Sequence, residues 1–313
     1  MNKYRAIADI DKYLDRTLRN IYTNAYDEIA NEIRYNIRHG IIPSSRTVSI
    51  KKKIEDVFNK LKTQVPITIE NEISNQIAKL MSDEKLSIQN SLIARSSAFR
   101  FIDIDSPAIS EPFIRNILRG GIDGVPISSR IWVYGNQIKR KLMTTVGNYI
   151  TQGISAEELI PSIKPFLLEP QGYGMMNGLV KRYKTLAKRF KDVDPEKYRE
   201  FMRRSKMIDA SIPRVGTGVY RSAYKNAWRL SVTEFNNAAQ LTNLEYYKSL
   251  DFVKKAKWNL NPIGHHCETC LSYAAHKPFN LDDYPNKPHP ICRCFPTSVI
   301  DYDYLYQKYG ITQ

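Results

Sequence analysis

Residues 267–294 read CETCLSYAAHKPFNLDDYPNKPHPICRC, and this stretch contains all 4 cysteines of the 313-residue chain. Most of the histidines lie in it or directly before it, namely His265, His266, His276 and His289. Thiolates and imidazoles are the usual ligands of zinc in proteins. Their concentration in one short stretch therefore predicts a metal site there.

The cysteines form two arms that are separated along the chain. Cys267 and Cys270 enclose two residues, a spacing that lets two thiolates turn toward one ion. The second arm offers either Cys292 with Cys294, which gives four thiolates, or His289 with Cys292, which gives three thiolates and one imidazole. We favour the four cysteines as ligands of one structural Zn²⁺, with His289 as the alternative fourth ligand or as a donor to a ligand.

Disulfides, buried free thiols and a redox pair are the competing interpretations of these cysteines. The first residues show no secretory signal, and cysteines confined to one module of a cytoplasmic protein favour metal over disulfides. We expect the Cys267–Cys270 pair to lie in a loop rich in Pro, His and Asn, and not at the start of a helix that follows a buried strand. This expectation argues against thioredoxin-like chemistry.

The net charge of +15 at pH 7 is unusually high for an otherwise ordinary globular composition. It predicts an anionic partner, either nucleic acid or an acidic protein surface. No apolar run approaches the roughly 18–20 residues that a membrane helix needs. We therefore expect a soluble protein, made in a cytoplasm, without a membrane partner.

Helical periodicity dominates the first 250 residues. Apolar residues recur every three or four positions over 4–37, and again from residue 49 to 92 with a break at Pro66, which predicts a helical hairpin. Glycines and polar runs over 99–126 indicate loops. Two further helices follow Pro126, with Ser155 and Glu158 as a capping box for the second. Asp103 and Asp105 are solvated loop acids in this interpretation.

The segment Lys181–Lys206 contains 11 Lys or Arg against 4 Asp or Glu, after a glycine-rich link at 171–178. It predicts two helices separated at Asp194-Pro195, and either a solvated surface or a sequence-independent contact with phosphates. The candidate nucleic-acid contacts are Lys181, Arg182, Lys184, Lys188, Arg189, Arg203 and Arg204.

The C-terminal segment predicts a small β element. Residues 252–260 alternate as a strand, and 276–280 could pair with them as a hairpin, against which the ion would hold Cys292–Phe295. Because so small a module buries little apolar surface, we expect the ion to supply most of its folding free energy. The aromatic residues of 301–310 suit an interface.

These elements predict a mainly α protein, an elongated bundle of helical hairpins with a zinc-stabilised β-hairpin module. The expected domains are an N-terminal hairpin (1–98), a loop-rich link with a second hairpin (99–172), a basic helical region (173–250), and the zinc module with its tail (251–313).

Several of these motifs resemble the phage minor head protein family, related to the F protein of phage Mu. The resemblance includes Trp258, Cys267-x-x-Cys270 and the closing His289-Pro290-x-Cys292-Arg293-Cys294. It also includes Ser128–Trp132 and a helix over Arg229–Ala238, in which Val232 replaces the family's usual Arg. The family's closing triplet is Cys-Arg-Cys or Cys-Arg-His, which favours Cys294 over His289 as a ligand.

The resemblance implies a non-catalytic head-morphogenesis protein of the virion, placed at the portal vertex and assembled in the host cytoplasm. Its expected partners are the portal protein, the major capsid protein and packaged DNA, and no small-molecule substrate is expected. Two alternatives compete with it. One is a zinc-containing nuclease, prompted by His265-His266, and the other is a sequence-independent DNA-binding protein. We expect Glu234 to be structural and assign no catalytic residue.

Overall fold

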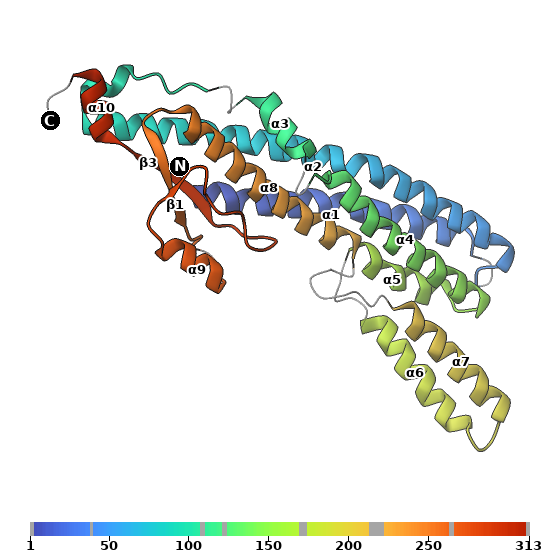
Figure 1. Cartoon of the computed structure of the whole chain (residues 1–313). Helices are drawn as coiled ribbons and strands as arrows, with labels where there is room; N and C mark the ends of the chain where they lie inside the picture. Colours follow the sequence, from blue (N-terminus) through green and yellow to red (C-terminus); the bar gives the residue numbers. More distant parts are fainter. Residues whose placement is uncertain are drawn as a thin grey trace. The chain divides into compact units, whose positions relative to one another are not determined.

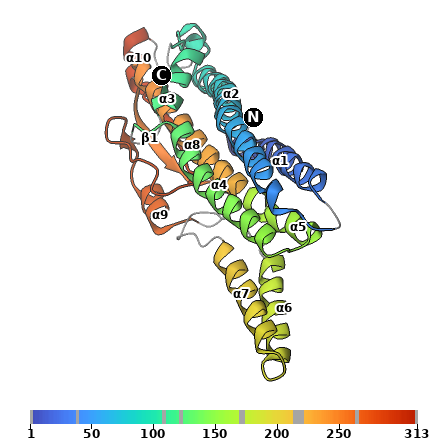
Figure 2. The same ribbon diagram turned by 90° about the vertical axis from the view of Figure 1, so that its right-hand side faces the viewer.

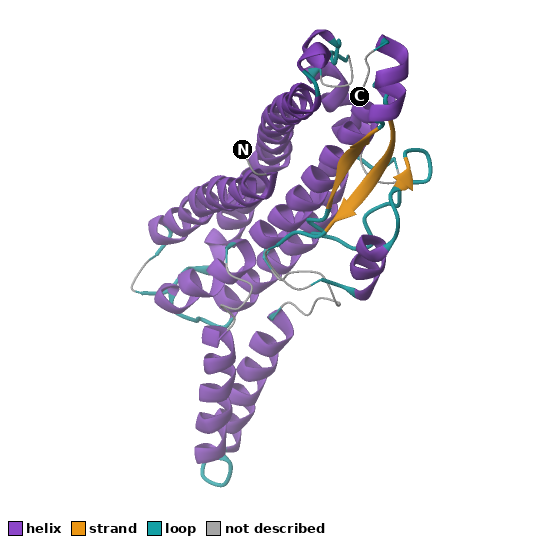
Figure 3. Ribbon diagram, turned by 90° about the vertical axis from the view of Figure 1, so that its left-hand side faces the viewer, coloured by secondary structure: helices purple, strands orange, loops and turns teal. Residues whose placement is uncertain are grey.

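The structure, a computed structural model, describes residues 3–37, 40–106, 110–120, 124–168, 174–212, 222–262 and 266–310. These residues are mainly helical, with one small antiparallel sheet near the C-terminus (Figures 1 and 3). A mainly α chain with a small C-terminal β element is therefore confirmed. The elongated bundle and the stabilisation by zinc stay predictions.

The longer helices are α1 (Lys3–Tyr35), α2 (Thr47–Arg95), α4 (Ile127–Thr151), α6 (Gly174–Phe190), α7 (Pro195–Ser211) and α8 (Ala223–Ser249). The shorter ones are α3 (Glu111–Gly120), α5 (Ala156–Leu167), α9 (Glu268–Ala275) and α10 (Tyr302–Tyr309), with 3₁₀ helices at Ser44–Arg46 and Ser97–Phe101. The strands are β1 (Val253–Asn259), β2 (Phe279–Asn280) and β3 (Phe295–Ile300).

The chain forms two compact units, each assembled from distant pieces. The first comprises Met1–Leu14, Ile67–Ile127 and Arg229–Gln313, and the second comprises Asp15–Pro66 and Ser128–Trp228. Helices α1, α2 and α8 contribute residues to both units. The four contiguous domains expected from the sequence stay a prediction.

In the second unit, α1 and α2 run antiparallel, as the periodicity predicts. Glu28 of α1 accepts hydrogen bonds from Lys53 and Lys60 of α2, both at 2.9 Å, and Glu32 accepts one from Ser49 at 2.7 Å. The expected apolar stripe is buried, including Leu18, Ile29, Ile33, Ile50, Ile54 and Val57. Packing of these stripes, more than helix propensity, stabilises such long helices.

The prediction that Pro66 interrupts the second helix was wrong. Helix α2 continues through Pro66 for its whole length. Proline removes one backbone hydrogen bond and strains the preceding turn, which costs about 3 kcal/mol. Val65 and Ile69 on either side are fully buried, so their burial offsets much of this cost.

One further expectation for the first unit was wrong. Residues 99–126 are not only loops, because they contain α3, which buries Ile114 and Leu118. The aromatic residues after 300 form α10, which Asp301 caps, and Tyr306 packs on Phe99 with ring centroids 5.2 Å apart. Their role in an interface stays a prediction. Short helices of this kind depend on tertiary contacts, which periodicity alone does not reveal.

The helices that follow Pro126 agree with the sequence. Gly153 ends α4 with a φ of 61°, and the Ser155 side chain caps α5 by accepting from the Glu158 backbone at 3.3 Å. The break at Asp194-Pro195 is also confirmed, because Asp194 caps α7. The glycine-rich link was wrong in part: 174–178 belong to α6, whereas 171–173 lie outside the described residues.

The C-terminal module has a three-stranded sheet in the order β2-β1-β3, with both pairs antiparallel. The predicted pairing of 252–260 with 276–280 is confirmed by the register of Ala256 with Phe279. The strand β3, which follows Cys294 directly, was not predicted. Trp258 is 1% exposed and its ring lies 5.1 Å from that of Tyr273 and 5.7 Å from that of Tyr284. The module therefore has an aromatic core as well as its cysteines.

Candidate metal centre

The first arm of the site is the N-terminus of α9, a short helix after β1 (Figure 1). Cys267 is the N-cap residue, and its Sγ accepts a hydrogen bond from the Cys270 backbone N–H at 3.3 Å. The expectation of a plain loop was therefore wrong, because the pair does begin a helix. Helix position alone consequently does not argue against redox chemistry.

The second arm is a tight turn that leads into β3. The Cys292 N–H donates to the His289 carbonyl at 3.3 Å, and Ile291 has a φ of 61°. A left-handed conformation is strained for a β-branched residue and persists only where its surroundings hold it. Here the Ile291 N–H donates to Thr233 Oγ1 of α8 at 3.2 Å, which fixes the turn.

The two arms meet at Cys270. Its Sγ lies 3.6 Å from Cys292 Sγ and 4.0 Å from His289 Nε2. The ligand atoms of Cys270, Cys292 and Cys294 lie within 4.8 Å of one another, and so do those of Cys267, Cys270 and His289. Two sulfurs on one tetrahedral zinc are separated by about 3.8 Å, given Zn–S bonds of about 2.3 Å. This Cys/His cluster could hold a metal ion.

The choice of the fourth ligand stays open in this geometry. Cys292 and Cys294 are both 3% exposed, whereas His289 is exposed. His289 Nδ1 lies 2.8 Å from the Pro290 carbonyl oxygen, an arrangement that would leave Nε2 available as a ligand. All four cysteines are free thiols in this structure, which therefore does not support the disulfide interpretation.

The thiols influence one another strongly. Burial raises the pKa of Cys270 to about 12. The hydrogen bond between Cys292 and Cys294 raises the pKa of Cys292 and lowers that of Cys294 to about 5. Without a metal ion, the site therefore favours a thiolate at Cys294 and retains protons on Cys270 and Cys292. A metal ion has to displace those protons, which makes its binding dependent on pH.

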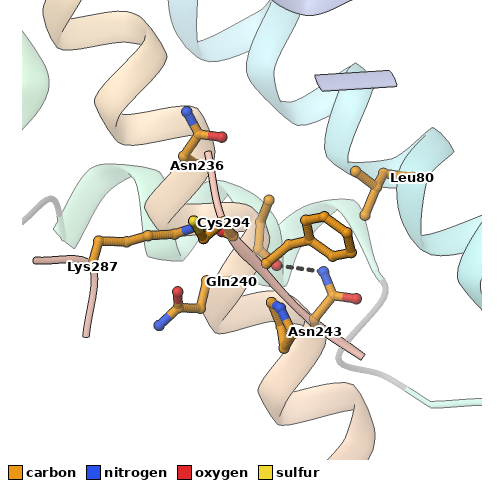
Figure 4. A pocket seen from close by; sticks show the side chains of 9 residues that line it. Leu80, Asn236, Gln240, Asn243, Lys287 and Cys294 are labelled. Carbon is orange, nitrogen blue, oxygen red and sulfur yellow. Dashed lines mark hydrogen bonds between the residues drawn. The ribbon is translucent and has the colours of Figure 1, made fainter. Parts of the chain in front are cut away.

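Two cationic side chains that the sequence did not identify support the second arm. Lys287 donates from Nζ to the Cys294 carbonyl, and burial lowers its pKa to about 8 although the nearby thiols oppose this. Figure 4 shows Lys287 extended toward Cys294 beside Asn236 and Gln240 of α8, in a small pocket. Arg293, between two candidate ligands, forms an ion pair with Asp11 of α1.

The other two histidines in the described part of the chain, His266 and His276, occupy other environments. The His276 ring stacks on Phe279 at a centroid distance of 4.4 Å, and its Nδ1 lies 2.6 Å from the Lys277 carbonyl oxygen. His266 is half-buried next to Cys267. His265 lies outside the described residues, so the His265-His266 pair behind the nuclease alternative is not defined.

The seven predicted nucleic-acid contacts lie on α6 and α7. Lys181, Lys184, Lys188, Arg189 and Arg203 are exposed. Arg182 is exposed and pairs with Glu158 at 3.1 Å, whereas the half-buried Arg204 pairs with Glu200 at 2.6 Å. Both helices belong to the second unit, and the metal cluster belongs to the first.

Comparison with protein families, with characterised proteins and with solved structures finds no match for this chain. Among the described residues, no helix is long and apolar enough to cross a membrane.

Proposed function

We propose that Cys267, Cys270, Cys292 and Cys294 bind one structural Zn²⁺. Three observations support this assignment. The two arms, distant in sequence, meet at Cys270, and the Sγ atoms of Cys270 and Cys292 lie 3.6 Å apart. Three of the four thiols, all except that of Cys267, are buried. Nitrogen and sulfur donors at tetrahedral spacing are typical of zinc. Four protein ligands leave no open position, which fits a structural ion and not a catalytic one.

We further propose that the protein is a non-catalytic minor head protein of a phage, acting in head assembly and DNA packaging at the portal vertex. The observation that carries this proposal is the contact between Thr233 and Ile291. These residues belong to two separate motifs through which the sequence resembles that family. A direct hydrogen bond between the motifs gives a physical reason for their occurrence in one protein.

The proposed partners are the portal protein and the major capsid protein, and the proposed location is the virion. To test this, the full chain would be co-expressed with candidate portal and shell proteins, each tagged in turn, and retention would be measured. We expect the portal protein to retain the chain. A Cys270→Ser variant tests whether binding to the portal protein depends on zinc. Its metal content and its retention by the portal protein are measured on the same sample.

If a folded, zinc-containing chain is retained by neither partner, the assignment to the phage head is contradicted. The proposal of a zinc site is unaffected by that result. A folded wild-type chain that lacks metal but still binds the portal would contradict the zinc proposal alone.

A further inference from the structure

Helices α6 and α7 form a hairpin (Figure 2). It belongs to the second unit and has its own apolar seam. The Phe201 ring lies 6.2 Å from that of Tyr183 and 5.6 Å from that of Phe190. Val180, Ala187 and Ile208 are buried along the same seam. The apolar faces of the two helices therefore pack against each other, and the outer faces carry charged side chains.

The outer faces are crowded with like charges. Lys181, Lys184 and Lys188 recur every three or four residues on α6, as do Arg199, Arg203 and Lys206 on α7, and all six side chains are exposed. Like charges at this spacing destabilise a helix by about 0.2–0.5 kcal/mol per pair. The hairpin thus carries a repulsion that a bound polyanion would relieve.

We propose that the α6–α7 hairpin binds the phosphate backbone of double-stranded DNA without regard to sequence. Lysine and arginine contacts to phosphate supply most of non-specific affinity. The segment 181–206 contains no Asn or Gln, the residues that read adenine by paired hydrogen bonds. Of its five arginines, the residue type that most often reads guanine, Arg182 and Arg204 are paired with glutamates. Tyr183 is buried and Phe190 packs on Phe201, so neither is available to stack on unpaired bases.

A membrane surface and an acidic protein fit the hairpin less well. Binding in a lipid interface needs an apolar helix face opposite the basic one, and here those faces pack against each other. An acidic protein surface is recognised by a few matched ion pairs in a fixed pattern. Repeated, exposed lysines along α6 instead suit an evenly charged rod, which DNA is.

The test measures fluorescence anisotropy of a labelled duplex with the full chain across about 50–200 mM salt. In the triple variant Lys181→Gln, Lys184→Gln and Lys188→Gln, we expect the slope of log K against log salt to fall in magnitude by about 2–3, since each phosphate contact contributes about 0.9. The matched control replaces three exposed lysines elsewhere, Lys52, Lys254 and Lys277, by Gln and should retain the slope.

Equal slopes for the triple variant and the wild-type chain would overturn the proposal. An equal decrease of the slope in the control variant would also overturn it, because binding would then depend on the total charge of the chain and not on the lysines of the hairpin. Displacement of the duplex by polyglutamate at equal charge, or by phosphatidylserine vesicles, would instead assign the hairpin to an acidic protein or a membrane. This proposal requires neither metal nor portal binding, so its failure and theirs are measured separately.

Discussion

Removal of single ligands tests the metal centre most directly. Cys270 belongs to both groups of neighbouring ligand atoms, whereas Cys294 and His289 belong to one each. Structural zinc sites contribute about 10–16 kcal/mol at neutral pH, or about 2.5–4 kcal/mol for each of four ligands. Loss of one ligand should therefore weaken zinc binding by roughly two to three orders of magnitude.

We expect Cys270→Ser and Cys294→Ser both to lose this much affinity, and His289→Ala to retain zinc with a decrease of at most about 10–100-fold, as for a residue that only supports a ligand. The assay is competition with a chromophoric chelator on the reduced, full-length chain, together with elemental analysis of one zinc per chain. Circular dichroism checks that each variant is folded.

The opposite ranking, in which His289→Ala loses the ion and Cys294→Ser retains it, would refute the four-thiolate site and favour three thiolates with one imidazole. Retention of zinc in Cys270→Ser would refute both sets, because Cys270 joins the two arms.

Three further predictions concern stability. Ile291→Gly should leave zinc affinity unchanged and lower the free energy of unfolding by less than about 1 kcal/mol, because relief of the left-handed strain offsets the lost side-chain packing. Chemical denaturation measures this, and a loss above about 3 kcal/mol would contradict the prediction. Pro66→Ala should raise the free energy of unfolding by about 1–3 kcal/mol, and an unchanged or lower melting temperature would contradict it. Burial raises the pKa of Asp15, but hydrogen bonds from Tyr224 and Lys225 outweigh burial and lower this pKa below its ordinary value of 3.8. The Asp15 carboxylate therefore stabilises the fold above pH 3.8, and this stabilisation is lost as the pH falls below that value. Asp15→Asn should accordingly reduce the loss of stability with acid in a profile of unfolding free energy against pH.

Sequence reasoning succeeded where a local pattern determines the structure. The spacing of Leu18, Ile29 and Ile33 places them on one helix face, and all three are buried. Ser155 was recognisable as a helix cap because its side chain acts on a backbone group three residues away, and the break at Asp194-Pro195 was recognisable from the proline. The concentration of cysteines likewise identified the candidate metal cluster without any knowledge of the fold.

It failed where an uncommon residue takes a capping position and where distant contacts decide. Cys267 was not recognised as a helix cap because cysteine is not among the residues that usually take that position. Nothing near Lys287 in the sequence indicates that its ammonium group reaches the Cys294 carbonyl, and nothing near Thr233 indicates its bond to Ile291. The continuation of α2 through Pro66 depends on burial of its neighbours, which a propensity rule does not count.

The ion pair between Asp11 and Arg293 has a consequence for biosynthesis. Arg293 is synthesised 282 residues after Asp11, yet both belong to one compact unit. Closing so long a loop costs entropy before any contact is gained, and it cannot begin until Arg293 has left the ribosome. We therefore expect the thiol turn to acquire this anchor to α1 only after the chain has been synthesised as far as Arg293.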